Sequence, residues 1–68
     1  MTKTKLKELR ERAGLSQTQL ALKAGVSPRM IPKYEAGAND INKAQGITLY
    51  KIAQVLGCKV EDLLELKE

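Results

Sequence analysis

The chain has 68 residues, with 12 Lys or Arg against 8 Asp or Glu, a single Cys, and no His, Trp or Phe. This length allows one domain near the lower size limit for a stable core, and one Cys excludes an internal disulfide. The absence of His removes the usual catalytic base and a His-containing zinc site, and no Gly-rich phosphate loop is present. We therefore expect no enzyme, no metal and no cofactor.

Positive charge is concentrated in the first half of the chain. Residues 1–34 carry a net charge of +6, and residues 35–68 carry −2. Such a division favours one face that meets a polyanion. No apolar run approaches the roughly 20 residues that span a bilayer, and no apolar signal region follows the basic start. The sequence predicts a cytoplasmic protein with no membrane partner and no small-molecule ligand.

Capping signals define the first two helices. Apolar residues spaced by three and four predict a helix over Thr4–Ala13, which ends at Gly14. Ser16 and Gln19 form a capping box, in which each side chain satisfies a free N–H of the other residue. The second helix begins there and stops at Gly25.

The second half of the chain is also predicted to be helical. Ser27 is the expected N-cap of a third helix, with Pro28 in its first position and an end near residue 35. Polar residues 38–43 predict a loop, and apolar spacing predicts a fourth helix over 44–56. A last short helix carries Val60, Leu63, Leu64 and Leu66. We expect an all-α bundle of five short helices that forms one domain over residues 1–68.

Residues 17–36 have the pattern of a helix-turn-helix. Ala21 is small enough to let two helices approach closely, and Gly25, four residues later, suits a turn that needs a positive φ. Ile31 and Tyr34 then point to a shared core. Two helices that meet across a turn of three or four residues form this motif.

A longer series of residues has the spacing of a known family. The series is Leu6–Arg10, Gly14–Gln17, Gln19–Ala21, Gly25–Ser27, Ile31, Tyr34, Glu35 and Gly37, then Leu49, Lys51–Ala53, Val55–Gly57, Val60 and Asp62–Leu64. It resembles the phage-repressor (Cro/CI or XRE-like) family of bacterial and phage transcription regulators. The resemblance covers residues 5–66 and implies the compact fold of that family, with the second and third helices as the helix-turn-helix.

The resemblance also implies how DNA is read. The second helix would lie across the sugar-phosphate backbone while the third enters the major groove. The base-contacting positions of the family fall on Pro28, Arg29, Pro32 and Lys33. Arg29 and Lys33 are four residues apart, hence on one helix face, and both suit the O6 and N7 acceptors of guanine.

Further residues are candidates for phosphate contacts or for structural roles. The resemblance implies that Gln17 donates to a phosphate at the start of the second helix, where the helix dipole adds partial positive charge. Ser27 and Lys43 are further phosphate candidates. Arg10 and Glu35 occupy family positions that form a partly buried ion pair. The alternative for each is an ordinary polar residue at the surface.

Pro32 departs from the family pattern. It lies inside the predicted third helix, where a proline lacks an N–H and costs about 3 kcal/mol. Either a loose first turn accommodates the ring, which then contacts a thymine methyl group, or the groove-facing surface is distorted and DNA reading is altered or lost.

Two functions follow from these patterns. The first is a sequence-specific double-stranded DNA-binding regulator, most simply a repressor, acting as a homodimer on half-sites about one helical turn apart. Leu63, Leu64 and Leu66 are candidate dimer contacts, with core packing as the alternative. The second function is an antitoxin-like or adaptor module that binds protein, favoured by Pro32 and the acidic tail. Strong salt dependence of duplex binding separates the two, because phosphate neutralisation releases counterions.

Overall fold

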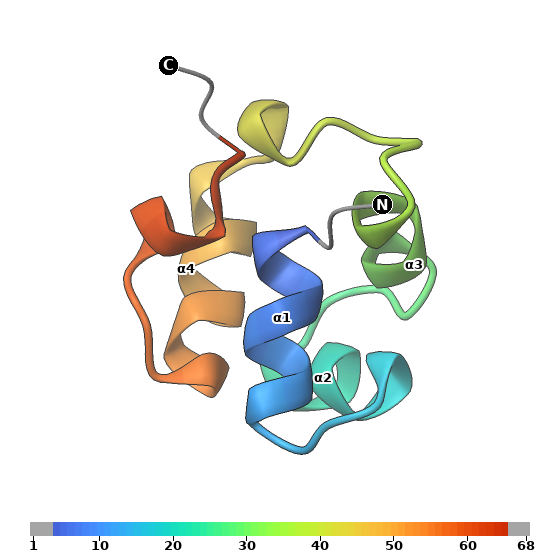
Figure 1. Ribbon diagram of the computed structural model, residues 1–68, viewed down its shortest axis with the longest axis vertical. Coiled ribbons are helices and arrows are strands. Elements are labelled where there is room, and N and C mark those ends of the chain that lie inside the picture. The colour runs from blue at the N-terminus through green and yellow to red at the C-terminus, as the bar shows by residue number, and fades with distance from the viewer. Residues whose placement is uncertain (1–3, 66–68) are drawn as a thin grey trace.

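The computed structural model describes residues 4–65, and every regular element within them is helical (Figure 1). Its four α-helices are α1 (Lys5–Arg12), α2 (Gln17–Ala24), α3 (Met30–Glu35) and α4 (Gly46–Leu56). Two 3-10 turns follow, η1 (Ile41–Lys43) after α3 and η2 (Val60–Leu63) after α4. The all-α class is confirmed, but the expected count of five helices is wrong. The last predicted helix is a single 3-10 turn over its described residues.

Side-chain caps start the first two helices where the sequence predicts them. Thr4 Oγ1 accepts a hydrogen bond from the Lys7 N–H at 3.2 Å. Ser16 Oγ accepts from the Gln19 N–H at 3.0 Å, and Gln19 Oε1 accepts from the Ser16 N–H at 2.9 Å. Gly25 ends α2 with a φ of +70°, which glycine adopts without strain. Local capping contacts therefore mark both ends of α2.

One apolar core joins the helices. Its largest fully buried side chains are Leu6, Leu20, Ile31, Ile52 and Leu63. They come from all four α-helices and from η2. Helix α2 packs against both α3 and α4. Helix α1, which lies in the centre of Figure 1, packs against α3 and η2. No helix in the described range is both long and apolar enough to cross a membrane.

A polar clasp holds the two ends of the described chain together. The Asn42 side chain donates from Nδ2 to the Glu65 C=O at 2.8 Å and accepts at Oδ1 from the Glu65 N–H at 2.9 Å. The carboxylate of Glu65 in turn accepts from the N–H of Lys5, the first residue of α1. Residue 65 is thus bonded both to η1 and to the start of the first helix.

Candidate nucleic-acid interface

The turn between α2 and α3 determines where α3 begins. Pro28 and Arg29 lie in a turn in which the Met30 N–H donates to the Ser27 C=O at 3.1 Å. The prediction that Ser27 caps the helix and that Pro28 is its first residue is therefore wrong. Helix α3 begins at Met30, with Arg29 as an N-cap that makes no capping hydrogen bond through its side chain. Ser27 Oγ accepts instead from the Arg29 N–H at 3.4 Å.

This later start accommodates Pro32. Pro32 is the third residue of α3, and the N–H groups of a helical first turn have no acceptor within the helix. A proline at this position removes no hydrogen bond, so the cost expected in a helix interior does not apply. The helix continues past the ring, since the Ala36 N–H donates to the Pro32 C=O at 2.9 Å.

The four residues expected to contact bases lie on the solvent side of the turn and α3. Pro28, Arg29, Pro32 and Lys33 are all exposed, whereas Ile31 between them is fully buried. Within residues 4–65 the side chains of Arg29 and Lys33 make no hydrogen bond and no ion pair. Both cations are therefore available to a ligand.

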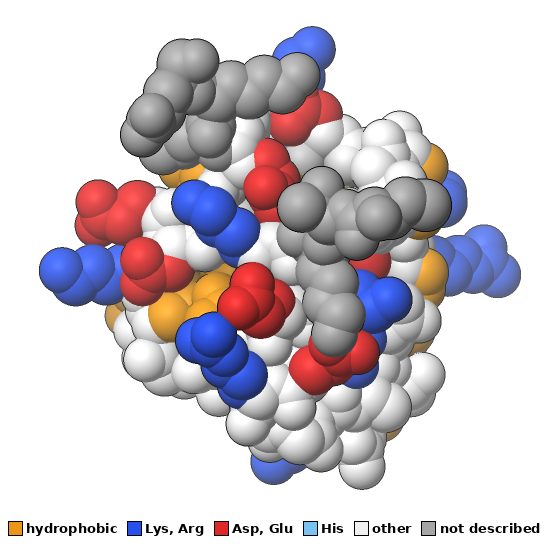
Figure 2. Space-filling view, in the orientation of Figure 1, with side chains coloured by type: hydrophobic (Ala, Val, Ile, Leu, Met, Phe, Trp, Pro, Cys, Tyr) orange, Lys and Arg blue, Asp and Glu red, His pale blue; other side chains and the backbone are white. Residues whose placement is uncertain are grey.

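Charge differs between the front and the right-hand edge of the view in Figure 2. In Figure 2, acidic and basic side chains alternate over the face that carries α1 and η2. At the right-hand edge, on the side where Figure 1 places α3, basic side chains project into solvent. The face over α1 is consequently a poor surface for a polyanion, and the side of α3 is a better one.

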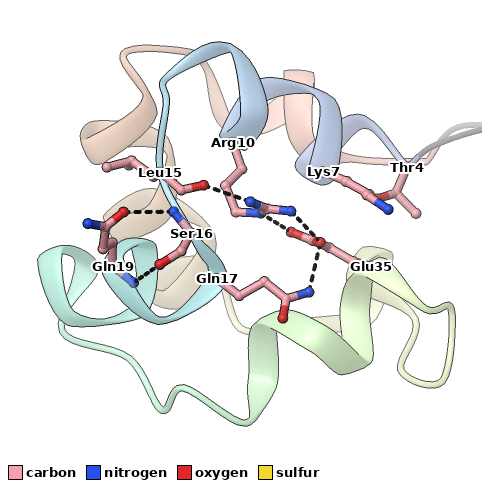
Figure 3. A network of polar contacts seen from close by, with 8 residues as sticks. All are labelled: Thr4, Lys7, Arg10, Leu15, Ser16, Gln17, Gln19 and Glu35. Atoms are coloured by element: carbon pink, nitrogen blue, oxygen red, sulfur yellow. Dashed lines mark hydrogen bonds and ion pairs between the residues drawn. The ribbon is translucent and has the colours of Figure 1, made fainter.

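Arg10, Gln17 and Glu35 form one network that joins α1, α2 and α3 (Figure 3). Arg10 donates from Nε and Nη2 to the two carboxylate oxygens of Glu35 at 2.7 and 3.1 Å. Its Nη1 donates to the Leu15 C=O at 2.6 Å, and Gln17 Nε2 donates to Glu35 Oε1 at 3.0 Å. Glu35 thus accepts hydrogen bonds from the first helix and from the first residue of the second.

The ion pair of this network is largely buried. The side chains of Arg10 and Glu35 are 11% and 4% exposed. The hydrogen bond to Glu35 raises the pKa of the Arg10 guanidinium, against the opposing effect of burial, so Arg10 stays charged. Because a bidentate pair constrains angle as well as distance, it holds α3 in a fixed position against α1.

The three candidates for phosphate contacts have different environments. Gln17 is half-buried and gives one N–H to Glu35, so its amide is already oriented. Ser27 is exposed in the turn before α3, and Lys43 is exposed at the end of η1. The helix-turn-helix brings Gln17 and Ser27 into one supersecondary unit, while Lys43 lies on a separate connection.

The residues expected to have structural roles lie at the junction of α2 and α3. Ala21 and Ile31 are fully buried, and Tyr34 is 8% exposed. The Ala21 C=O accepts from the Val26 N–H at 3.0 Å, directly after Gly25 takes its positive φ. These contacts close the end of α2 and direct the chain into α3.

Sequence reasoning missed two sets of contacts. It gave Gln17 a role toward DNA but not its hydrogen bond to Glu35, 18 residues away. It also missed the clasp of Asn42 and Glu65, because polar residues in a loop and near a terminus carry no periodic signal. In the described part of the chain, no group of three or more His, Cys, Asp or Glu side chains is placed to hold a metal ion.

Comparison with known proteins agrees with this geometry. A family model described as helix-turn-helix matches residues 6–63, from the second residue of α1 to the last residue of η2. Among curated proteins, no significant sequence match was found.

Proposed function

Since the chain belongs to the Cro/CI-type helix-turn-helix family of DNA-binding regulators, we propose that it recognises a specific double-stranded DNA sequence and represses transcription there. The observation that carries this proposal is the pair of cations Arg29 and Lys33, which are exposed at the start and on the outer side of α3 and have no side-chain partner among residues 4–65. Its partner is double-stranded DNA in the cytoplasm. Repression follows where the protein, bound to its operator, blocks access of the polymerase.

In the proposed complex α3 enters the major groove and α2 crosses the backbone. Arg29 donates two hydrogen bonds to O6 and N7 of a guanine, and Lys33 donates to a neighbouring acceptor. Gln17 uses one N–H on Glu35, which leaves its second amide N–H for a phosphate oxygen. Ser27 and Lys43 add phosphate contacts on either side, which fix the register without reading sequence.

Useful specificity requires two copies, because one module of this size contacts only a few base pairs. The principal-axis extents of the molecule are 31 × 25 × 21 Å, slightly less than the half-site spacing of about 34 Å, so two copies on one operator would be near neighbours. Leu63, an expected contact, is fully buried, Leu64 is half-buried, and Leu66 lies outside the described residues. We therefore place the homodimer contact on the outward face of α4, where Ile47 and Tyr50 are exposed and three residues apart.

The second candidate function is an antitoxin-like or adaptor module that binds another protein. It is favoured by the exposure of large apolar side chains, which reaches 70% for Leu22, 57% for Ile47 and 54% for Tyr50. Pro32 no longer supports it, because the proline lies in the first turn of α3 and breaks no hydrogen bond.

Selection of binding sites from random duplexes tests the proposal. We expect enrichment of a motif with two-fold symmetry, and an affinity that falls steeply as salt is raised. Arg29→Ala is expected to weaken binding to the selected duplex by about 10- to 100-fold in fluorescence anisotropy.

Arg12→Ala is the matched control, because Arg12 is an exposed arginine that pairs with Glu8 on α1 and lies outside the proposed interface. It is expected to leave the affinity within about twofold, as for a surface pair of little energetic weight. Weak binding without enrichment at low salt would contradict DNA recognition and favour the adaptor.

A further inference from the structure

The side chains that would face the major groove lack hydrogen-bond acceptors. Pro28 and Arg29 in the turn and Pro32 and Lys33 on the outer side of α3 are exposed. Arg and Lys carry only hydrogen-bond donors, and a proline side chain carries neither a donor nor an acceptor. None of the four side chains can therefore accept a hydrogen bond from a base.

Several neighbouring oxygen atoms already accept hydrogen bonds. The carboxylate of Glu35 accepts from Arg10 and Gln17, and Ser27 Oγ accepts from the Arg29 N–H. The Pro32 C=O accepts from the Ala36 N–H. The Lys33 C=O accepts from the N–H groups of residues 38 and 39. On the side chains of Glu35 and Ser27, the acceptors next to this surface therefore already accept at least one hydrogen bond.

The backbone places Pro32 beside Arg29. Although Arg29 precedes α3, its φ of −72° and ψ of −22° are helical. Residues three and four positions further along a helix are its neighbours, and these are Pro32 and Lys33. An apolar ring and a second cation therefore follow Arg29 on the same side of the helical backbone.

Adenine N6 and cytosine N4 are the donors that the major groove presents, while guanine offers two acceptors and thymine an acceptor and a methyl group. We propose, building on the proposed function, that the half-site is read only through guanine and thymine. Arg29 contacts O6 and N7 of a guanine, and Pro32 contacts the 5-methyl group of a thymine on a neighbouring base pair. Pro32 is thus a specificity-determining residue, and none of the four side chains reads a base through its amino group.

Base analogues in the selected duplex test this reading. Replacement of the thymine by deoxyuridine, which lacks only the methyl group, is expected to weaken binding about three- to fivefold. Replacement of the guanine by 7-deazaguanine, which lacks the N7 acceptor, is expected to weaken binding about tenfold. Replacement of any adenine by 2-aminopurine, which removes the amino group from the major groove, is expected to change binding less than about twofold.

Protein variants identify the side chain that contacts the thymine methyl group. With Pro32→Gly, which leaves no side-chain carbon, the duplexes containing thymine and deoxyuridine should bind equally, whereas Pro28→Gly should preserve the difference between them. Pro32→Gln supplies an acceptor, so repeated selection with this variant should enrich adenine at the affected position. Circular dichroism of each variant controls for folding.

The outcomes separate this reading from the proposed function. An enriched motif that tolerates deoxyuridine at every thymine, or that loses about tenfold with 2-aminopurine, overturns the reading and leaves DNA recognition intact. Absence of any enriched motif overturns both.

Discussion

Glu35 connects three helices through a single carboxylate. It accepts two hydrogen bonds from Arg10 on α1 and one from Gln17 on α2, while it lies itself at the end of α3. Removal of one member of a buried pair leaves the partner charge without compensation, which costs more than the pair contributes. The orientation of α3, which is proposed to contact the DNA bases, therefore depends on this residue.

Glu35→Ala is expected to lower the free energy of unfolding by about 3 kcal/mol or more, measured by urea denaturation. Glu8→Ala is the control, because Glu8 and Arg12 form an exposed pair with side chains 50% and 72% exposed. That change should cost less than about 0.5 kcal/mol. Equal losses of unfolding free energy for the two variants would show that the hydrogen bonds of Glu35 do not stabilise the packing of α1, α2 and α3.

At the scale of elements, the sequence predicted most of the helices but not where α3 begins. Caps such as Ser16 and Gly25 act through neighbouring atoms, so their effect can be read from short segments. Ser27 and Pro28 also look like a helix start, but Pro32 is compatible with a regular helix only in its first turn. That constraint is satisfied when α3 begins at Met30.

Residues distant in sequence were harder to predict. The Arg10–Glu35 pair was implied by resemblance to a family and not by the pattern of charges. The hydrogen bond from Gln17 to Glu35 depends on the angle between α2 and α3, which no local signal specifies. The proposed roles of Pro28, Arg29, Pro32 and Lys33 toward bases stay predictions.

The position of Pro32 can be tested by stability alone. Pro32→Ala is expected to change the free energy of unfolding by less than about 1 kcal/mol, because no intrahelical hydrogen bond is gained at the third helical position. Lys51→Pro, in the exposed middle of α4, should cost about 3 kcal/mol or more. A stabilisation of about 3 kcal/mol by Pro32→Ala would mean that the ring is strained in α3.

At the scale of the whole molecule, the outward face of α4 determines the proposed assembly. The opposite face of this helix packs Leu49, Ile52 and Ala53 into the core, so Ile47 and Tyr50 have no role in it. In a dimer with two-fold symmetry the same patch is contributed by both copies. A charge placed there is therefore introduced twice into one interface.

Tyr50→Asp is expected to abolish dimers in sedimentation velocity and to weaken binding to a full operator by about 100-fold, through loss of the second attachment. Binding to an isolated half-site should not change. For sedimentation velocity alone, because α2 is proposed to cross the DNA backbone, Leu22→Asp is the control, since Leu22 is still more exposed but lies on α2. Loss of the dimer in the control alone would place the contact on α2.

The clasp of Asn42 and Glu65 brings the two ends of the described chain close together. Because the Glu65 carboxylate bonds the N–H of Lys5, residues 65 and 5 are in contact. Direct joining of Glu68 to Met1 would leave six residues to connect Glu65 with Thr4, a reach of about 20 Å and more than sufficient. A circularly permuted chain, opened between exposed Asn39 and Asp40, should therefore fold to the same helical content by circular dichroism. The order of the helices along the chain could then be changed while the surface proposed to bind DNA is kept.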